Sequence, residues 1–112
     1  MNIKDYDLRK VAVYVLAGLL NSQKNIDYYL DKSYEKGERV EKFVLDKIFP
    51  RLDYLERRLI LHKYGKEREP DNLFVADILS LKEDDVKKIE QAAIKKLADI
   101  KDDLESLINN KH

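Results

Sequence analysis

The 112-residue chain carries 22 basic and 22 acidic residues, so its formal net charge is zero, and it contains no cysteine. The lack of cysteine excludes disulfides, thiolate catalysis and cysteine-ligated metal centres, and the zero net charge counts against strong nonspecific binding to nucleic acid. With 44% hydrophobic and 39% charged residues but only three glycines and two prolines, the composition is typical of one folded helical domain rather than a disordered chain.

Apolar residues recur at helical spacing along the chain, which predicts an all-α, single-domain helical bundle. The first predicted helix begins after Asp7, whose carboxylate can cap it, and its apolar stripe extends through Ile26 and Leu30. Residues 11–20 within it are apolar on every side. We therefore expect this segment to be the most deeply buried helix.

The same apolar run bears on the location of the protein. Residues 11–20 provide only about half of the ~20 apolar residues that a membrane-spanning helix needs. Asp5 and Asp7 lie where a signal peptide would carry basic residues, and no A-x-A cleavage site follows. We therefore expect a cytoplasmic protein with no membrane partner.

The middle of the chain is divided by glycine and proline. Gly37 predicts a break before a second helix, which ends before Pro50 and has an inner face formed by Val40, Phe43, Val44 and Ile48. A third helix follows and ends near Gly65, and its apolar positions are Leu52, Leu55, Leu59 and Ile60. After a polar loop at 66–71, Asp71 or Asn72 can cap a short helix that carries Leu73, Val75, Ile78 and Leu79.

A long last helix is predicted after Ser80 and Leu81, and Ser80 with Glu83 can form the capping box that starts it. Its apolar positions are Val86, Ile89, Ala93, Leu97, Ile100, Leu104 and Leu107. The apolar seam at 97–108 leaves two alternatives. One is a homodimer contact between two copies of the C-terminal helix, and the other, which we favour, is packing against the chain's own first helix.

Two adjoining segments carry the most specific pattern in the chain. Residues 52–65 read LDYLERRLILHKYG, and residues 75–97 read VADILSLKEDDVKKIEQAAIKKL. Close helix crossing in this region is permitted by the small residues Ala76, Ala92 and Ala93, and an enclosed core by Val75, Ile78, Leu79, Leu81, Val86 and Ile89. The order of helix, polar loop, short helix, tight turn and long helix resembles region 4 of the sigma-70 family, and VKKIEQAAIKKL resembles its motif V-R-Q-I-E-x-x-A-L-x-K-L.

The resemblance covers residues of about 52–97 and implies a C-terminal helix-turn-helix. Within the single domain 1–112, we expect N-terminal helices of unassigned role at 1–50, the sigma-region-4-like helix-turn-helix at 51–99 and a helical tail at 100–112. The family's activity implies a non-enzymatic, transcription-associated protein that binds promoter or operator DNA.

In the sigma-70 family the second helix of this motif enters the major groove of DNA. The residues that can serve DNA here are Lys82, Lys87, Lys88, Gln91 and Lys95, with Arg57 and Arg58 on the preceding helix. By resemblance, Lys87 and Lys88 occupy recognition-helix positions that face DNA. The alternative interpretation of these two lysines is a solvated helix face.

The first turn of the predicted recognition helix departs from the family. Glu83, Asp84 and Asp85 place three negative charges where the family carries basic and polar contacts. They stabilise the helix N-terminus through its dipole, but like charges about 4 Å apart repel by about 1 kcal/mol in water. These acids favour a second hypothesis, in which the same scaffold is a protein-interaction module that binds RNA polymerase or another transcription protein rather than DNA.

A remote alternative rests on Arg57 and His62, whose R-x4-H spacing resembles the motif of the all-α HEPN ribonucleases. In that family the residue after the arginine is usually small and polar, whereas here it is Arg58. No acid–histidine cluster has the spacing of metal ligands, so we expect neither a metal nor a cofactor.

Overall fold

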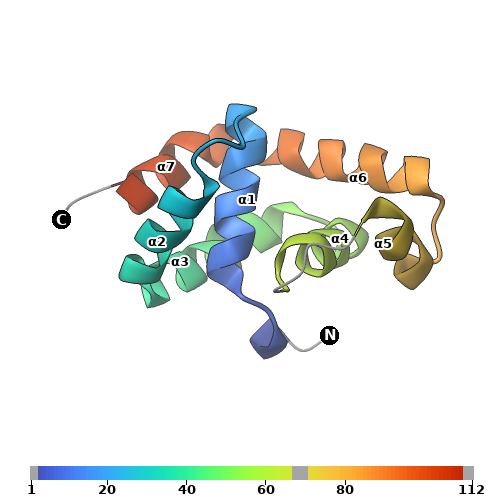
Figure 1. The fold of residues 1–112 in the computed structure, drawn as a ribbon, viewed down its shortest axis with the longest axis horizontal. Coiled ribbons are helices and arrows are strands. Elements are labelled where there is room, and N and C mark those ends of the chain that lie inside the picture. Colours follow the sequence, from blue (N-terminus) through green and yellow to red (C-terminus); the bar gives the residue numbers. More distant parts are fainter. Residues whose placement is uncertain (1–2, 67–70, 110–112) are drawn as a thin grey trace.

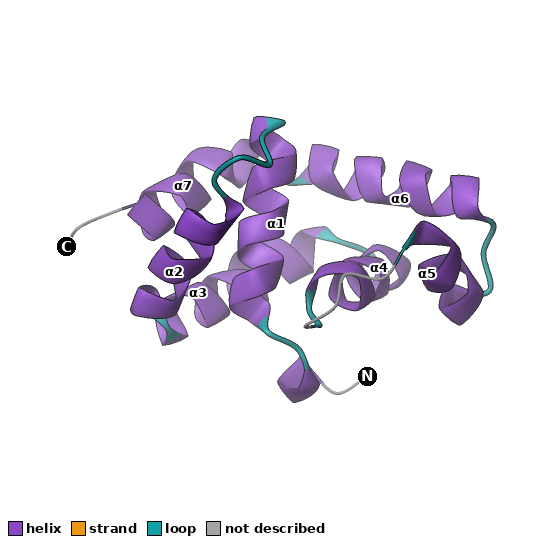
Figure 2. Cartoon of the chain, viewed as in Figure 1, coloured by secondary structure: helices purple, strands orange, loops and turns teal. Residues whose placement is uncertain are grey.

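The computed structural model describes residues 3–66 and 71–109 (Figure 1). These residues form helices and no strand, in a single all-α domain, as predicted. The α-helices are α1 (Leu8–Leu20), α2 (Ile26–Lys36), α3 (Glu38–Phe43), α4 (Tyr54–Tyr64), α5 (Asn72–Leu79), α6 (Glu83–Lys96) and α7 (Lys101–Asn109). Short helical turns lie at Ile3–Asp5, Val44–Ile48, Phe49–Arg51 and Ala98–Ile100. Short loops connect most of these elements (Figure 2).

Helix α1 lies at the centre of the fold, where it contacts α2, α3, α4, α6 and α7 (Figure 1). The predicted cap at its start is confirmed, because Asp7 Oδ1 accepts hydrogen bonds from the backbone N–H groups of Arg9 (3.0 Å) and Lys10 (3.3 Å). Its side chains fill the core on nearly every side, the fully buried ones being Val11, Ala12, Val13, Val15 and Leu16. The prediction that this is the most buried helix is also confirmed.

The first helix is shorter than predicted. It ends at Leu20, and Asn21 adopts a left-handed conformation with φ of 52°. The N–H of Ser22 then donates to the carbonyl oxygen of Ala17 (3.0 Å), which is the Schellman arrangement that closes a helix. Ile26 therefore begins a separate helix, α2, which packs beside α1. The reason is local, because the polar residues 21–25 offer no apolar face that could continue the helix.

The predicted break at Gly37 is confirmed, since this glycine separates α2 from α3 with φ of 51°. The helix that follows is less regular than expected. After Phe43 it continues as a π-helical turn, and Pro50 lies in a 3-10 turn rather than beyond the helical segment. Proline has no N–H to donate, so the regular α-helical ladder cannot continue through this position. The inner face is nevertheless close to the predicted one, with Val40, Val44 and Ile48 buried and Phe43 half-buried.

Helix α4 begins with a capping box that the sequence reasoning missed. The backbone N–H of Glu56 donates to Asp53 Oδ1 (2.8 Å), and the backbone N–H of Asp53 donates to Glu56 Oε1 (2.9 Å). Leu52 consequently lies before the helix rather than in it, although it is buried. The predicted end is confirmed, because α4 stops at Tyr64 with Gly65 as its C-cap.

The turn between α5 and α6 differs from the prediction at Ser80. Asp71 caps α5 as expected, accepting from the N–H of Phe74 (2.8 Å). Ser80 ends α5 in a left-handed conformation with φ of 57°, and the N–H of Leu81 donates to the carbonyl oxygen of Ala76 (2.8 Å). Ser80 is thus the C-cap of α5, whereas the N-cap of α6 is Lys82, which makes no side-chain capping bond. The predicted capping box of Ser80 is wrong, because Ser80 takes part in the Schellman closure of α5 instead of the start of α6.

Replacing Ser80 with glycine is expected to raise the free energy of unfolding by about 0.5 kcal/mol. The left-handed conformation costs a non-glycine residue roughly 1 kcal/mol, and the greater entropy of glycine in the unfolded chain offsets part of that gain. Ser80→Val should lower the free energy of unfolding by at least about 1 kcal/mol, because the branched valine side chain disfavours a positive φ. Urea denaturation followed by circular dichroism measures both changes, and equal midpoints for the two variants would contradict the assignment.

The long last helix is in fact two helices. Helix α6 ends at Lys96, a 3-10 turn follows at Ala98–Ile100, and α7 then runs in a different direction (Figure 1). Because of this turn, α7 contacts α1, α2 and α3. The residues of the predicted seam that become buried within the chain are Leu97, Ile100, Leu104 and Ile108. Of the two alternatives for the seam, packing on the chain's own first helix is confirmed, and these four side chains are not available for a homodimer contact.

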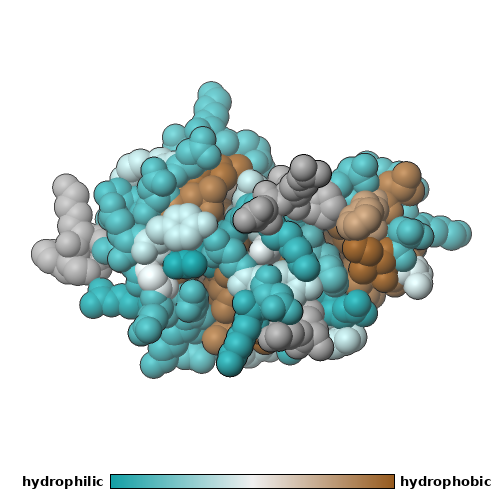
Figure 3. Space-filling model, turned by 60° about the horizontal axis from the view of Figure 1, so that its bottom comes forward, coloured by the Kyte–Doolittle hydropathy of each residue, from teal (hydrophilic) through white to brown (hydrophobic). Residues whose placement is uncertain are grey.

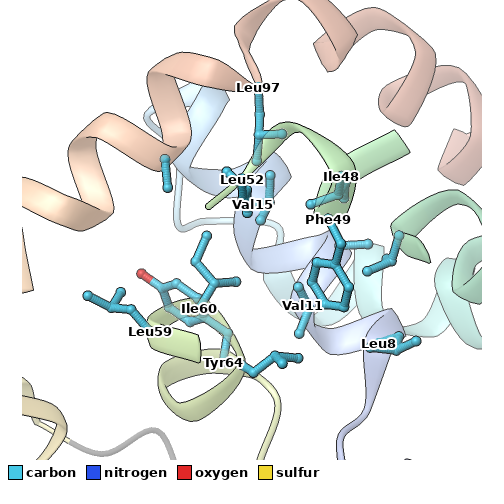
Figure 4. Close-up of a cluster of buried hydrophobic side chains, with 14 of the residues drawn as sticks. Leu8, Val11, Val15, Ile48, Phe49, Leu52, Leu59, Ile60, Tyr64 and Leu97 are labelled. Atoms are coloured by element: carbon cyan, nitrogen blue, oxygen red, sulfur yellow. The ribbon is translucent and has the colours of Figure 1, made fainter. Parts of the chain in front are cut away.

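One hydrophobic core serves the whole domain. Figure 4 shows side chains from the N-terminal part of the chain meeting side chains from α4 and from the end of α6. The labelled members are Leu8, Val11, Val15, Ile48, Phe49, Leu52, Leu59, Ile60, Tyr64 and Leu97. The described residues before position 50, for which no role was predicted, therefore share a core with the segment that contains the predicted recognition helix.

Candidate nucleic-acid interface

Helix α6 packs against both α4 and α5 along one side. The side chains it buries there include Val86 and Ala93, and α5 contributes Val75, Ala76 and Leu79. Two predicted core residues are placed differently, since Ala92 is exposed and Ile78 is 39% exposed. The buried face of α6 is the one that carries Val86 and Ala93, and the buried face of α5 is the one that carries Val75 and Leu79. Ala92 and Ile78 lie outside these faces.

The outer side of α6 carries the predicted DNA-facing residues. Lys87, Lys88, Gln91 and Lys95 are all exposed, and they lie beyond the first turn of the helix. Lys87, Gln91 and Lys95 are separated by four residues each, so they form one stripe. The acidic residues Glu83 and Asp84 are also exposed but are confined to the first turn.

The stripe borders an open groove that the sequence did not reveal. Lys87, Gln91 and Lys95 line it from α6, and the end of α1 lines it with Gly18, Leu19 and Asn21. Lys63 from α4 and Asn72 at the start of α5 also contribute. Gly18 allows the two helices to approach closely, since a Cβ atom added to it would lie 3.1 Å from Ile94 Cδ1.

The charge of this groove is positive. Of its charged side chains, Glu90 accepts hydrogen bonds from both Lys63 Nζ and the Tyr64 hydroxyl, so its carboxylate is already paired. Lys87 and Lys95 remain without a carboxylate partner among the described residues. Two cationic groups and several amides therefore face an open surface, an arrangement that suits phosphate oxygens.

The other predicted residues lie elsewhere. Lys82 is exposed at the start of α6. Arg57 is half-buried and donates from Nη2 to the carbonyl oxygen of Leu52 (3.1 Å), and the guanidinium of Arg58 lies over the Tyr54 ring at 5.6 Å. Neither arginine lines the groove, so the structure does not join them to the α6 stripe.

The groove residues that sequence reasoning missed include three polar ones from outside α6, namely Asn21, Lys63 and Asn72. Each comes from a different helix end, and they meet only because α1, α4 and α5 converge on the middle of α6. No spacing within the chain could have indicated this convergence. The one local signal is the polar segment at 21–25, across which the apolar stripe nevertheless predicts a continuous helix.

Arg57 and His62, the pair behind the ribonuclease alternative, have separate partners. The His62 ring meets Tyr6 edge-on at 5.8 Å, and its Nδ1 lies 3.4 Å from the Tyr6 hydroxyl. Burial, and then the charges of Arg58 and Lys66, lower the pKa of His62 below its usual value. Arg57 instead donates to the carbonyl oxygen of Leu52, just before its own helix, so no observation favours a shared catalytic site.

No protein-family model, curated protein or solved structure matches this chain. The part of the chain that the structure describes contains no helix long and apolar enough to cross a bilayer. It also contains no group of three histidine, aspartate or glutamate side chains arranged to hold a metal ion. The interface is therefore interpreted from its own geometry and charge.

Proposed function

We propose that this chain is a transcription-associated protein that binds duplex DNA through α6, in the manner of a sigma-region-4-like helix-turn-helix. The observation that carries the proposal is the exposed stripe of Lys87, Gln91 and Lys95, with Lys88 beside it. The acidic first turn lies at one end of this stripe and not within it. The positions that favour DNA and those that oppose it are thus separated along the helix.

The dimensions of the stripe suit the major groove. From Lys87 to Lys95 the helix rises about 12 Å, which is close to the width of that groove. Lysines supply phosphate contacts that fix the position of the protein, and a glutamine such as Gln91 can bond to an adenine edge. The amides of Asn21 and Asn72 stand across the groove from α6 and can donate to the same phosphate backbone.

A salt series tests this proposal. Binding of fluorescently labelled random duplex DNA, followed by anisotropy, should weaken steeply with salt because each neutralised phosphate releases counterions. Lys87→Glu combined with Lys88→Glu should weaken binding about tenfold at low salt and lower the salt slope by about 2.

The matched control is Lys42→Glu with Lys47→Glu, since both lysines are exposed on α3 and the turn after it, which are not among the main packing partners of α6. This control changes the net charge by the same amount and should leave the salt slope near that of the unmodified chain. An absence of duplex binding at low salt, or equal effects of the two double variants, would overturn the proposal.

A second candidate is a protein-interaction module, with RNA polymerase or another transcription protein as the partner. The observation that favours it is the exposed acidic turn of Glu83 and Asp84, which repels phosphate but suits a basic protein surface. Glu83→Lys with Asp84→Lys separates the candidates. It should strengthen duplex binding if α6 meets DNA, and it should weaken the protein complex if the acidic turn meets a partner.

A further inference from the structure

Helix α5 is apolar on both of its faces, but the fold buries only one. Val75, Ala76 and Leu79 face the core. On the opposite side Leu73 is 64% exposed, Phe74 is 56% exposed and Ile78 is 39% exposed. Exposed apolar side chains that gather on one surface commonly mark a site of contact with another molecule.

Two of these exposed side chains, Leu73 and Phe74, line a shallow depression. Ala76 and Leu81 are its other apolar residues, and Asp71 and Asp77 line it as well. Figure 3 shows hydrophobic surface gathered at the end of the molecule that α5 forms. The depression is suited to receive an apolar side chain from another molecule.

The charges around this face are mainly negative. Asp71, the N-cap of α5, and Asp77 on α5 are exposed, and Glu83 and Asp84 are exposed on the adjacent first turn of α6. The neighbouring cation is Lys82, which is exposed in the turn between the two helices. Among these described residues the acids therefore outnumber the bases by four to one.

We propose that the outer face of α5 is a docking surface for a basic amphipathic segment of a partner protein. The apolar side chains of that segment contact Leu73, Phe74 and Ile78, and its lysines or arginines meet the acids around them. This inference rests on the second candidate function and does not need DNA binding. It also gives the acidic first turn of α6 a role.

The charge pattern favours this occupant over two others. A symmetric contact between two copies of the chain would place the acids of one copy against those of the other. A membrane rich in anionic lipid would be repelled by the same acids. A basic amphipathic segment can contact the apolar side chains of this face and pair with the acids around them.

The test uses a fluorescein-labelled model peptide whose leucines recur every three or four residues on one face of a helix and whose lysines occupy the other face. Anisotropy should show that it binds the full chain, and that a peptide with glutamate in place of every lysine does not. Leu73→Ser with Phe74→Ser should weaken binding at least about tenfold, because two apolar contacts are lost. Both side chains are largely exposed, so the variant should keep its helical circular dichroism.

The matched control is Tyr28→Ser with Leu45→Ser, which removes exposed apolar side chains from α2 and from the turn after α3. This control should bind the lysine peptide as the unmodified chain does. The proposal would be overturned if the variant with Leu73→Ser and Phe74→Ser bound the lysine peptide as tightly as the unmodified chain does, or if the glutamate peptide bound as tightly as the lysine peptide. It would also be overturned if the unmodified chain sedimented as a dimer and this variant as a monomer, since the occupant would then be a second copy. Duplex binding is measured separately with the α6 variants, so either function can fail alone.

Discussion

Leu104→Ala is expected to lower the free energy of unfolding by about 3 kcal/mol. Leu104 has no exposed surface, and its helix α7 packs on α1, α2 and α3. Truncation of a buried leucine removes its apolar contacts and leaves a cavity, which together cost about 3–5 kcal/mol. The total stability of a domain of this size is only about 5–15 kcal/mol, so the loss should appear as a large shift of the urea midpoint.

The control is Ser106→Ala, an exposed position on the same helix, which should change the free energy of unfolding by less than about 0.5 kcal/mol. Protein concentration provides a second readout. If the α7 seam joined two copies, the urea midpoint would rise with protein concentration, whereas packing within one chain makes it independent of concentration. A concentration-dependent midpoint, or a loss below about 1 kcal/mol for Leu104→Ala, would contradict the observed packing.

Several helix boundaries could be predicted from local signals. Asp7 was predicted as a cap, and Asp71 as one of two candidate caps, because a carboxylate before an apolar run can accept from the next N–H groups. Gly37 was identified as a break because glycine readily adopts a positive φ. The burial of residues 11–13 and 15–17 follows from the lack of any charged face in this segment.

The missed helix ends share one physical reason. Apolar spacing remains in phase across a short break, so Ile26 and Leu30 continue the stripe of α1, and Ile100 and Leu104 continue that of α6. Periodicity alone therefore indicates one long helix in each case. The break after α1 coincides with the polar residues 21–25. The break after α6 depends on packing across the molecule, since only after the turn at Ala98–Ile100 can α7 contact α2 and α3.

The same distinction applies to the candidate interface. Lys87, Gln91 and Lys95 were predicted, and they share one exposed stripe because their spacing lies within a single helix. Arg57 and Arg58 were predicted with them but lie outside the groove, since their placement depends on how α4 is rotated against its neighbours. Lys63 lies on α4 too, and it was missed for the same reason.

Glu56→Ala is expected to lower the free energy of unfolding by about 2 kcal/mol. The Glu56 carboxylate is almost fully buried, and its Oε1 accepts from the backbone N–H of Asp53 (2.9 Å) and from Lys96 Nζ (2.6 Å). It thus closes the capping box of α4 and joins the start of that helix to the end of α6. Loss of a cap costs about 1 kcal/mol, and loss of a charge-assisted hydrogen bond to a buried group costs at least as much.

Glu56→Gln should cost less than Glu56→Ala, because the amide oxygen can still accept from Asp53 while the charge opposite Lys96 is lost. The exposed Glu35, which pairs with Lys32 at 3.5 Å, provides the control, and Glu35→Ala should change the free energy of unfolding by less than about 0.5 kcal/mol.

The hydrogen bond to Glu56 raises the pKa of Lys96 above its usual 10.5. A raised lysine pKa stabilises the fold below pH 10.5 and loses that effect as the pH passes the folded-state value, so Glu56→Ala should flatten the alkaline decline of stability. Equal losses for Glu56→Ala and Glu35→Ala, or an unchanged alkaline decline, would show that the link between α4 and α6 contributes little to the fold.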